Sequence, residues 1–143
     1  DDGFYLIYAQ GVLHHFNPID VLLPVLNSKL LPGGKIVSLD PLQTNVLIRS
    51  VRMIYNHSRT DKEWEWPFTR QTFNTLRKYF LIRNLQGVIG QSKWAIPVSF
   101  IWPSLALKLA TDLHRRDLSY ARTEGRALWS CMQLVMCLEK ERN

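Results

Sequence analysis

The stretch FYLIYAQGVLHHF, residues 4–16, together with LLPGGKIVSLDP, residues 30–41, decides the fold. Phe4 to Ala9 and Lys35 to Leu39 are short apolar runs, which are typical of strands buried on both faces in a parallel sheet. The segment between them is long enough for one helix. The spacing therefore predicts a right-handed βαβ unit with two parallel strands.

The connecting helix is predicted over residues 17–30. Asn17 is its expected N-cap, Pro18 its first helical residue and Asp20 a favourable acid in its first turn. The sequence LPGG at residues 31–34 should end it, because proline followed by glycine suits a type II turn whose glycine has a positive φ.

The spacing of apolar residues predicts the helices and strands of the rest of the chain. Helices are predicted over residues 42–55, 70–80, 105–117 and 121–140, and strands over residues 81–89 and 93–101. Thr69 is the expected cap of the helix that follows it. The predicted class is therefore α/β. We expect a partial, mostly parallel Rossmann-like sheet with an antiparallel closing strand, flanking helices and a helical C-terminal tail.

Composition restricts the class of protein further. The chain has 143 residues, 46% of them hydrophobic, and a net charge of +6, which is typical of a globular domain rather than a disordered chain. The longest apolar candidate for a membrane span, residues 94–110, is interrupted by Pro97, Pro103 and Lys108. The opening Asp1-Asp2 does not resemble a secretory signal.

The basic residues indicate which partners the protein could bind, and the cysteines indicate its cellular compartment. Residues 49–83 carry eight basic and three acidic side chains, which suits an anionic substrate, an anionic membrane surface or a plain solvated helix face. No motif for specific nucleic-acid binding accompanies them. Cys131 and Cys137 are expected to stay unpaired and reduced, so we expect a cytoplasmic protein.

Three features occur in a fixed order: the loop Ala9–His15 after the first strand, the LLPGG turn at residues 30–34, and Asp40-Pro41 at the end of the second strand. This ordered set resembles class I S-adenosylmethionine-dependent methyltransferases that act on small molecules. The resemblance covers residues 3–41 well and residues 69–101 more loosely. It implies S-adenosylmethionine as the cofactor and a small-molecule methyl acceptor as the partner.

The resemblance also implies which part of the family's domain is present. The family's glycine-rich loop, its ribose-binding acid and its adenine contacts would precede Asp1. Residues 1–102 would then be the C-terminal half of a methyltransferase domain, and residues 103–143 a helical extension packed on it. The alternative is a non-catalytic remnant that binds a partner chain.

Candidate site residues lie at the ends of the two strands, where α/β sheets bind ligands. The resemblance places Gln10, Gly11 and Val12 against the methionine part of the donor. His14 or His15 is a candidate base for the methyl acceptor, because a histidine can take a proton at neutral pH. The alternative for His14 is a packing or hydrogen-bonding role in the loop. No metal site is predicted, since adjacent histidines point apart and no third ligand is evident.

Asp40, Trp64 and Trp66 are the candidate acceptor-binding residues. Asp40 either binds a substrate hydroxyl or amine, or caps the next helix. In the resembled family the region of the two tryptophans is a variable lid over the acceptor. They either line an apolar acceptor pocket or pack beneath the loop.

The strand at residues 4–9 is expected to have one unpaired edge, because its second neighbour would belong to the missing half. It contains no lysine or proline to discourage pairing. We therefore expect the chain to self-associate or aggregate through that edge.

Overall fold

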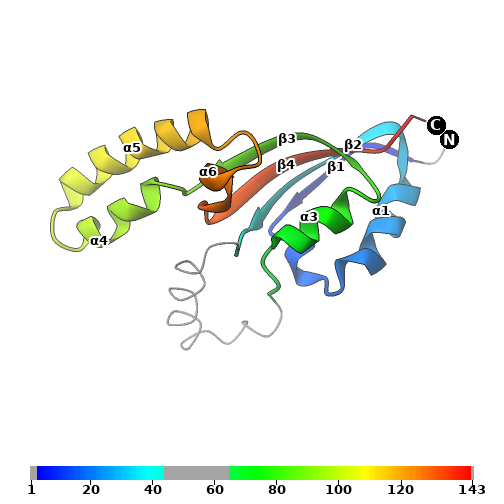
Figure 1. Ribbon diagram of the computed structural model, residues 1–143, viewed down its shortest axis with the longest axis horizontal. Helices are drawn as coiled ribbons and strands as arrows, with labels where there is room; N and C mark the ends of the chain where they lie inside the picture. Colours follow the sequence, from blue (N-terminus) through cyan, green and yellow to red (C-terminus); the bar gives the residue numbers. More distant parts are fainter. Residues whose placement is uncertain (1–2, 44–64, 143) are drawn as a thin grey trace.

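The fold is a mixed sheet with helices, seen in a computed structural model that describes residues 3–43 and 65–142 (Figure 1). The described strands form one four-stranded sheet in the order β1-β2-β4-β3. Their bounds are β1 Phe4–Gln10, β2 Leu30–Pro41, β3 Leu81–Val88 and β4 Gln133–Glu139.

Three of these strands run in the same direction. β1 pairs with β2 in parallel, whereas β4 lies antiparallel to both β2 and β3. Because β4 is reversed relative to both of its neighbours, β3 points the same way as β1 and β2. The carboxyl ends of β1, β2 and β3 therefore lie at the same end of the sheet, which is called its carboxyl edge below. This confirms the predicted class, a mostly parallel α/β sheet with one antiparallel closing strand.

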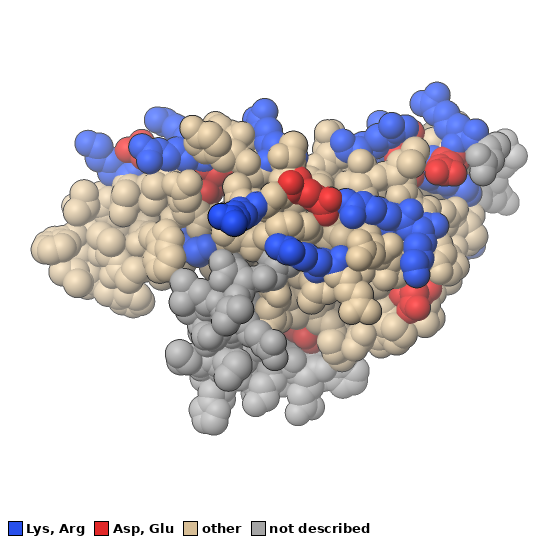
Figure 2. All heavy atoms as spheres, viewed as in Figure 1, with Lys and Arg blue, Asp and Glu red and all other residues tan. Residues whose placement is uncertain are grey.

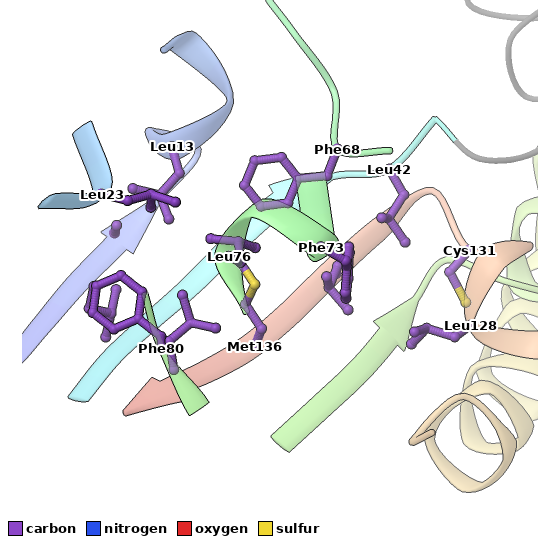
Figure 3. Close-up of a cluster of buried hydrophobic side chains, with 14 of the residues drawn as sticks. Leu13, Leu23, Leu42, Phe68, Phe73, Leu76, Phe80, Leu128, Cys131 and Met136 are labelled. Carbon is purple, nitrogen blue, oxygen red and sulfur yellow. The ribbon is translucent and has the colours of Figure 1, made fainter. Parts of the chain in front are cut away.

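One face of the sheet is packed against helices α1 Leu22–Lys29 and α3 Arg70–Leu76. The buried residues of β2 and β4 alternate and face each other in register, as Ile36 does with Leu138. Figure 3 shows Phe73, Leu76 and Phe80, from α3 and the turn after it, gathered beside Met136 of β4. One face of the helix that follows Thr69 is therefore buried in the core.

Thr69 caps α3 as the sequence predicts. The backbone N–H of Thr72 donates to Thr69 Oγ1 over 3.4 Å, and the Thr69 N–H donates to Thr72 Oγ1 over 3.1 Å. Two of the donors at the start of the helix are thereby satisfied reciprocally.

The first helix begins later than predicted. Pro18 is extended, with φ −76° and ψ 142°, and a 3-10 turn over Ile19–Val21 precedes α1. Asn17 is therefore not the N-cap of α1. At the other end, Gly33 has the predicted positive φ of 74°, but the turn interrupts β2 instead of preceding it. Phe4 pairs with Leu30 and Leu6 with Lys35, so the LPGG residues bulge out of the ladder.

β1 is more exposed than its apolar sequence predicts. It lies at one edge of the described sheet, and Phe4, Tyr5, Leu6 and Tyr8 are all more than half exposed. Burial on both faces needs a further strand beside β1 and helices over it, and a periodicity argument assumes those neighbours. The expectation of a buried strand is therefore wrong for this chain.

The C-terminal part of the chain differs most from the sequence prediction. The expected strand over residues 93–101 is a 3-10 turn, Ser92–Trp94, followed by helix α4 Ala95–Ser99. The helix expected over residues 105–117 is present and longer, as α5 Pro103–Tyr120. The helix expected over residues 121–140 is wrong, because only α6 Arg126–Trp129 is helical there and β4 follows.

The expected helical tail therefore contains the closing strand. β4 pairs with β2 on one side and with β3 on the other, so the sheet holds together through the end of the chain. Between β3 and β4 the chain forms α4, α5 and α6; Figure 1 shows α4 and α5 projecting beyond the end of the sheet, with α6 close to the ends of β3 and β4. The predicted helix over residues 42–55 lies almost entirely outside the described residues.

Candidate functional site

The predicted site loop leaves the carboxyl end of β1. Gly11 has φ +64°, and its N–H donates to the carbonyl of Leu39 over 2.8 Å. This hydrogen bond holds the loop at the end of β2, and it occupies the backbone N–H of Gly11. Gln10 and Val12 on either side are exposed at the same edge. The loop then closes into a 3-10 turn over Leu13–His15.

Asp40 of β2 holds this turn in place. Its Oδ1 accepts from the backbone N–H of His14 over 3.1 Å and lies 2.9 Å from His14 Nδ1. Both residues are buried, with 6% of His14 and 1% of Asp40 exposed. Asp40 Oδ2 has no hydrogen-bond partner among the described residues. Asp40 therefore orients His14 from within the fold, and the proposed contact with a substrate remains a prediction.

His15 is the exposed member of the histidine pair. Its ring lies against the ring of His14, with centroids 4.1 Å apart and planes tilted by 36°. The order from the interior outward is thus Asp40, His14 and His15. In this arrangement His14 is enclosed between Asp40 and the neighbouring ring, whereas His15 is exposed to solvent.

The segment before α3 completes this edge of the sheet. The N–H of Trp66 donates to the carbonyl of His14 over 2.8 Å, and the N–H of Phe68 donates to the carbonyl of Pro41 over 2.8 Å. Leu42 and Phe68 also form an isolated parallel bridge. Trp66 is therefore brought to the histidine loop from more than fifty residues away. Trp64 lies outside the described residues.

A cavity of about 450 Å³ lies beside this segment. Its walls come from the loop after His15, from residues 65–69 and from one side of α3. They combine aromatic groups, two carboxylates and several hydroxyls, the principal ones being Phe16, Asp20, Glu65, Trp66, Thr72 and Thr75. Trp66 lines this cavity, and its contact with a methyl acceptor stays a prediction. The threonines of α3 gave no signal in the sequence beyond the cap at Thr69.

A second network of buried polar groups was not predicted from the sequence. The carboxylate of Asp117 in α5 accepts from the backbone N–H groups of Gly90, Gln91 and Ser92 and from the Ser92 hydroxyl. Burial alone would raise the pKa of Asp117, but these donors outweigh it and hold the pKa below its ordinary value. This network fastens α5 to the end of β3 and is separate from the histidine loop.

Comparison with known proteins supports the fold assignment. No protein-family model and no curated protein matches the sequence. Solved structures do resemble it. An S-adenosylmethionine-dependent methyltransferase from Mesorhizobium loti is similar over 97% of this chain and 62% of its own, with 17% identity and a TM-score of 0.55. A phosphoethanolamine N-methyltransferase from Haemonchus contortus is similar over 98% of this chain and 34% of its own, with 11% identity and a TM-score of 0.55.

The fold is therefore that of the class I S-adenosylmethionine-dependent methyltransferases. The [4+2]-cyclase SpnF shares it, with 14% identity, a TM-score of 0.55 and coverage of 100% of this chain and 52% of its own. The present chain thus spans between a third and two thirds of the length of these three structures. Because one of the three is named for another reaction, the fold alone leaves the chemistry to the site.

Proposed function

We propose that the chain is the acceptor-side half of an S-adenosylmethionine-dependent methyltransferase. The observation that carries the proposal is the ordered loop at the carboxyl edge of the sheet. There, His15 stacks outside His14, which Asp40 holds from below, and the aromatic cavity begins at the next residue, Phe16. The similarity to methyltransferase structures adds weight to this reading.

The residues at this edge fit one end of the donor. Gln10 and Val12 are exposed at the end of β1, and among the described residues the side chain nearest to a Cβ on Gly11 would be that of His14, at 3.9 Å. This leaves room for the methionine end of S-adenosylmethionine, although the Gly11 N–H is already bonded to Leu39. We propose that residues upstream of Asp1 supply the glycine-rich loop and the groups for ribose and adenine.

When bound, S-adenosylmethionine supplies an electrophilic methyl group on a positively charged sulfur. The acceptor atom forms the new bond to that carbon, the carbon–sulfur bond breaks, and its electron pair stays on sulfur. We assign to His15 the removal of the proton that the acceptor atom then loses. His14 positions the ring of His15, and the cavity beside Trp66 holds the acceptor so that the attack is in line.

The test of the donor proposal is a calorimetric titration of the 143-residue chain with S-adenosylmethionine. Weak or undetectable binding is expected, because the chain offers groups for only the methionine end. A longer chain that adds an upstream glycine-rich strand–loop–helix should bind the donor tightly. Tight, saturable binding by the 143 residues alone would contradict the proposed division of the domain.

The test of the catalytic proposal is His15→Ala in that longer chain. We expect turnover to fall about a hundredfold, a typical loss for one general base, with little change in the melting temperature. His114→Ala, an exposed histidine on α5, is the matched control and should change neither. Unchanged turnover in His15→Ala would remove this residue from the site and leave the loop backbone as the contributor.

The free edge of β1 favours a second candidate function, binding of a partner chain. The edge is apolar on both faces, with Tyr5 78% and Tyr8 65% exposed. Such an edge offers unpaired backbone groups to another strand. For the 143-residue chain we propose that the first partner is a second copy, so that it dimerises or aggregates through β1.

Light scattering across a range of concentrations tests this second proposal. The apparent mass should rise with concentration for the 143-residue chain and stay constant for the longer chain, in which an upstream strand covers β1. A start codon directly before Asp1 in the coding sequence would favour the partner-binding remnant over the enzyme. A monodisperse monomer at high concentration would exclude an open, pairing edge.

The cysteines bear on the cellular location that we propose. Cys131 and Cys137 are free, as the sequence predicts, although Cys137 lies on β4 and not on the expected helix. Unpaired thiols suit a reducing compartment. We propose that the protein works in the cytoplasm.

A further inference from the structure

The helical hairpin formed by α4 and α5 projects from the carboxyl edge of the sheet. β3 ends at Val88 and leads directly into this hairpin, so it leaves the sheet at the edge where the histidine loop lies. Figure 1 shows α4 and α5 side by side, with their connection at the far end of the molecule. The base of the hairpin is fixed by the bonds of Asp117 to residues 90–92.

The far end of this hairpin is apolar and exposed. Phe100 is 85%, Ile101 67% and Trp102 61% exposed. Further large apolar side chains on the two helices and on the 3-10 turn before α4 are also more than half exposed, namely Trp94, Ile96, Leu105 and Leu107. A groove of about 320 Å³, which Ala95, Ile96 and Leu107 help to line, lies between the two helices. An exposed apolar patch of this kind on a projecting hairpin can enter a fluid apolar layer.

Positive charge accompanies the apolar end. Residues 92–122 contain five lysines and arginines against two aspartates, and one of those aspartates is the buried Asp117. Lys108 and Arg115 are exposed and seven residues apart, so they lie on the same side of α5. In Figure 2 the apolar left end of the molecule is largely tan, and lysine and arginine atoms gather along the upper side, over α5.

We propose that the α4–α5 hairpin docks on an anionic lipid surface, with Phe100, Ile101 and Trp102 entering the interface. Tryptophan and phenylalanine favour the boundary between headgroups and acyl chains, and lysine and arginine are attracted to anionic lipids. Lys108 lies six residues beyond Trp102, about 9 Å along the helix, which places it at the level of the lipid phosphates. Among the described residues, no helix is long and apolar enough to cross a membrane.

Docking in this way would turn the carboxyl edge of the sheet towards the lipid. The inference rests on the hairpin alone and not on the proposed methyl transfer. It therefore holds or fails independently of the donor titration and the His15→Ala assay.

The experiment is co-sedimentation of the chain with vesicles of phosphatidylcholine, with and without about 30% phosphatidylserine, at low and high salt. We expect binding to the anionic vesicles, with a blue shift of tryptophan emission, and much weaker binding to phosphatidylcholine alone. Trp102→Phe should lose most of the blue shift while still binding.

Two variants and their matched controls separate the apolar and the electrostatic parts. Phe100→Ser/Ile101→Ser should weaken binding at least roughly tenfold, because both side chains then stay in water. Tyr5→Ser, an equally exposed apolar residue on β1, should leave binding unchanged. All three of these side chains are exposed, so circular dichroism should show an unaltered fold.

The charge variant is Lys108→Gln/Arg115→Gln, which should weaken binding to anionic vesicles about fivefold per charge removed. Lys29→Gln/Lys78→Gln removes the same charge elsewhere and should have a clearly smaller effect. Equal losses in the two charge variants, or equal losses in the tip variant and Tyr5→Ser, would overturn the proposal. So would a chain that ignores vesicles but forms a dimer that Phe100→Ser/Ile101→Ser abolishes, since a second copy would then cover the hairpin.

Discussion

Replacing Asp117 by asparagine should weaken the attachment of the hairpin to the sheet. Asp117 is 3% exposed, and its Oδ2 accepts from Gly90 N–H over 2.9 Å and from the Ser92 N–H and hydroxyl over 3.1 and 2.8 Å. Its Oδ1 accepts from Gln91 N–H over 2.6 Å. Asparagine has one carbonyl oxygen. If that oxygen replaces Oδ2, the amide NH₂ meets the Gln91 N–H donor to donor.

The expected cost follows from these contacts. Asp117→Asn converts charge-assisted hydrogen bonds into neutral ones and leaves at least one partly buried N–H without an acceptor, which together cost about 2–4 kcal/mol. For a chain of this length that lowers the melting temperature by about 10 °C and the urea midpoint by about 1–2 M. Amide hydrogen exchange should accelerate across α4 and α5 more than in β2 and β4.

The pH dependence gives an independent check. The pKa of Asp117 lies below its ordinary value in the folded chain, so its contribution is fully present above the unfolded pKa and is lost as the pH falls through the folded pKa. The difference in unfolding free energy between wild type and Asp117→Asn should therefore be constant near neutrality and shrink on acidification, beginning around pH 4 to 5.

The control is Asp112→Asn on the same helix, where the carboxylate is exposed and lies 3.8 Å from Arg115. Its loss should be under about 0.5 kcal/mol. If Asp117→Asn matched this control, or if its destabilisation did not change with pH, the reasoning about the buried carboxylate would be refuted.

Three further predictions concern stability and reactivity. Thr69→Ala should cost about 1 kcal/mol in urea unfolding through loss of the capping box, whereas Thr111→Ala, exposed in the middle of α5, should cost less. Gly87→Ala should destabilise by about 1–3 kcal/mol, because the new Cβ would lie 2.5 Å from Cys131 Sγ; in a double-mutant cycle Cys131→Ala should offset part of this loss. Burial raises the pKa of the Cys131 thiol to about 11, so iodoacetamide at about pH 8 should label Cys131 slowly in the native chain, more slowly than Cys137, and fast in urea.

The parts of the fold that could be predicted from the sequence are those set by neighbours along the chain. β1 and β2 are apolar runs bounded by turn residues, and α3 has a cap and an inward stripe within a dozen residues. β4 could not be identified in this way. Leu134, Val135 and Leu138 fit one face of a helix, and they form a strand only because β2 and β3 offer backbone partners on both sides.

The same distinction applies to the candidate site: its residues could be predicted from their places in the sequence, but the contacts between them could not. His14 and Asp40 were each singled out by their position after a strand, but the bond between them depends on the parallel register that pairs Gln10 with Leu39. Trp66 was predicted from its composition as part of a lid, whereas its contact with the histidine loop is a backbone bond that no side-chain pattern encodes. Asp117 gave no signal, because its partners are backbone N–H groups more than twenty residues away.

The long connection between β3 and β4 is the feature that the sheet itself does not explain. Antiparallel neighbours can be joined by a short hairpin loop, and β3 and β4 pair from Leu81 with Glu139 to Val88 with Gln133, with one register shift between Ile82 and Asn84. The inserted residues contribute to the core near the sheet, through Leu128 and Cys131, and are fastened there by Asp117. None of this needs Phe100, Ile101 or Trp102, whose exposure lowers solubility without stabilising the fold. An apolar end on a hairpin whose base is fixed to the sheet by Asp117 is therefore better explained by a surface that it contacts than by folding, and the vesicle experiment decides whether that surface is lipid.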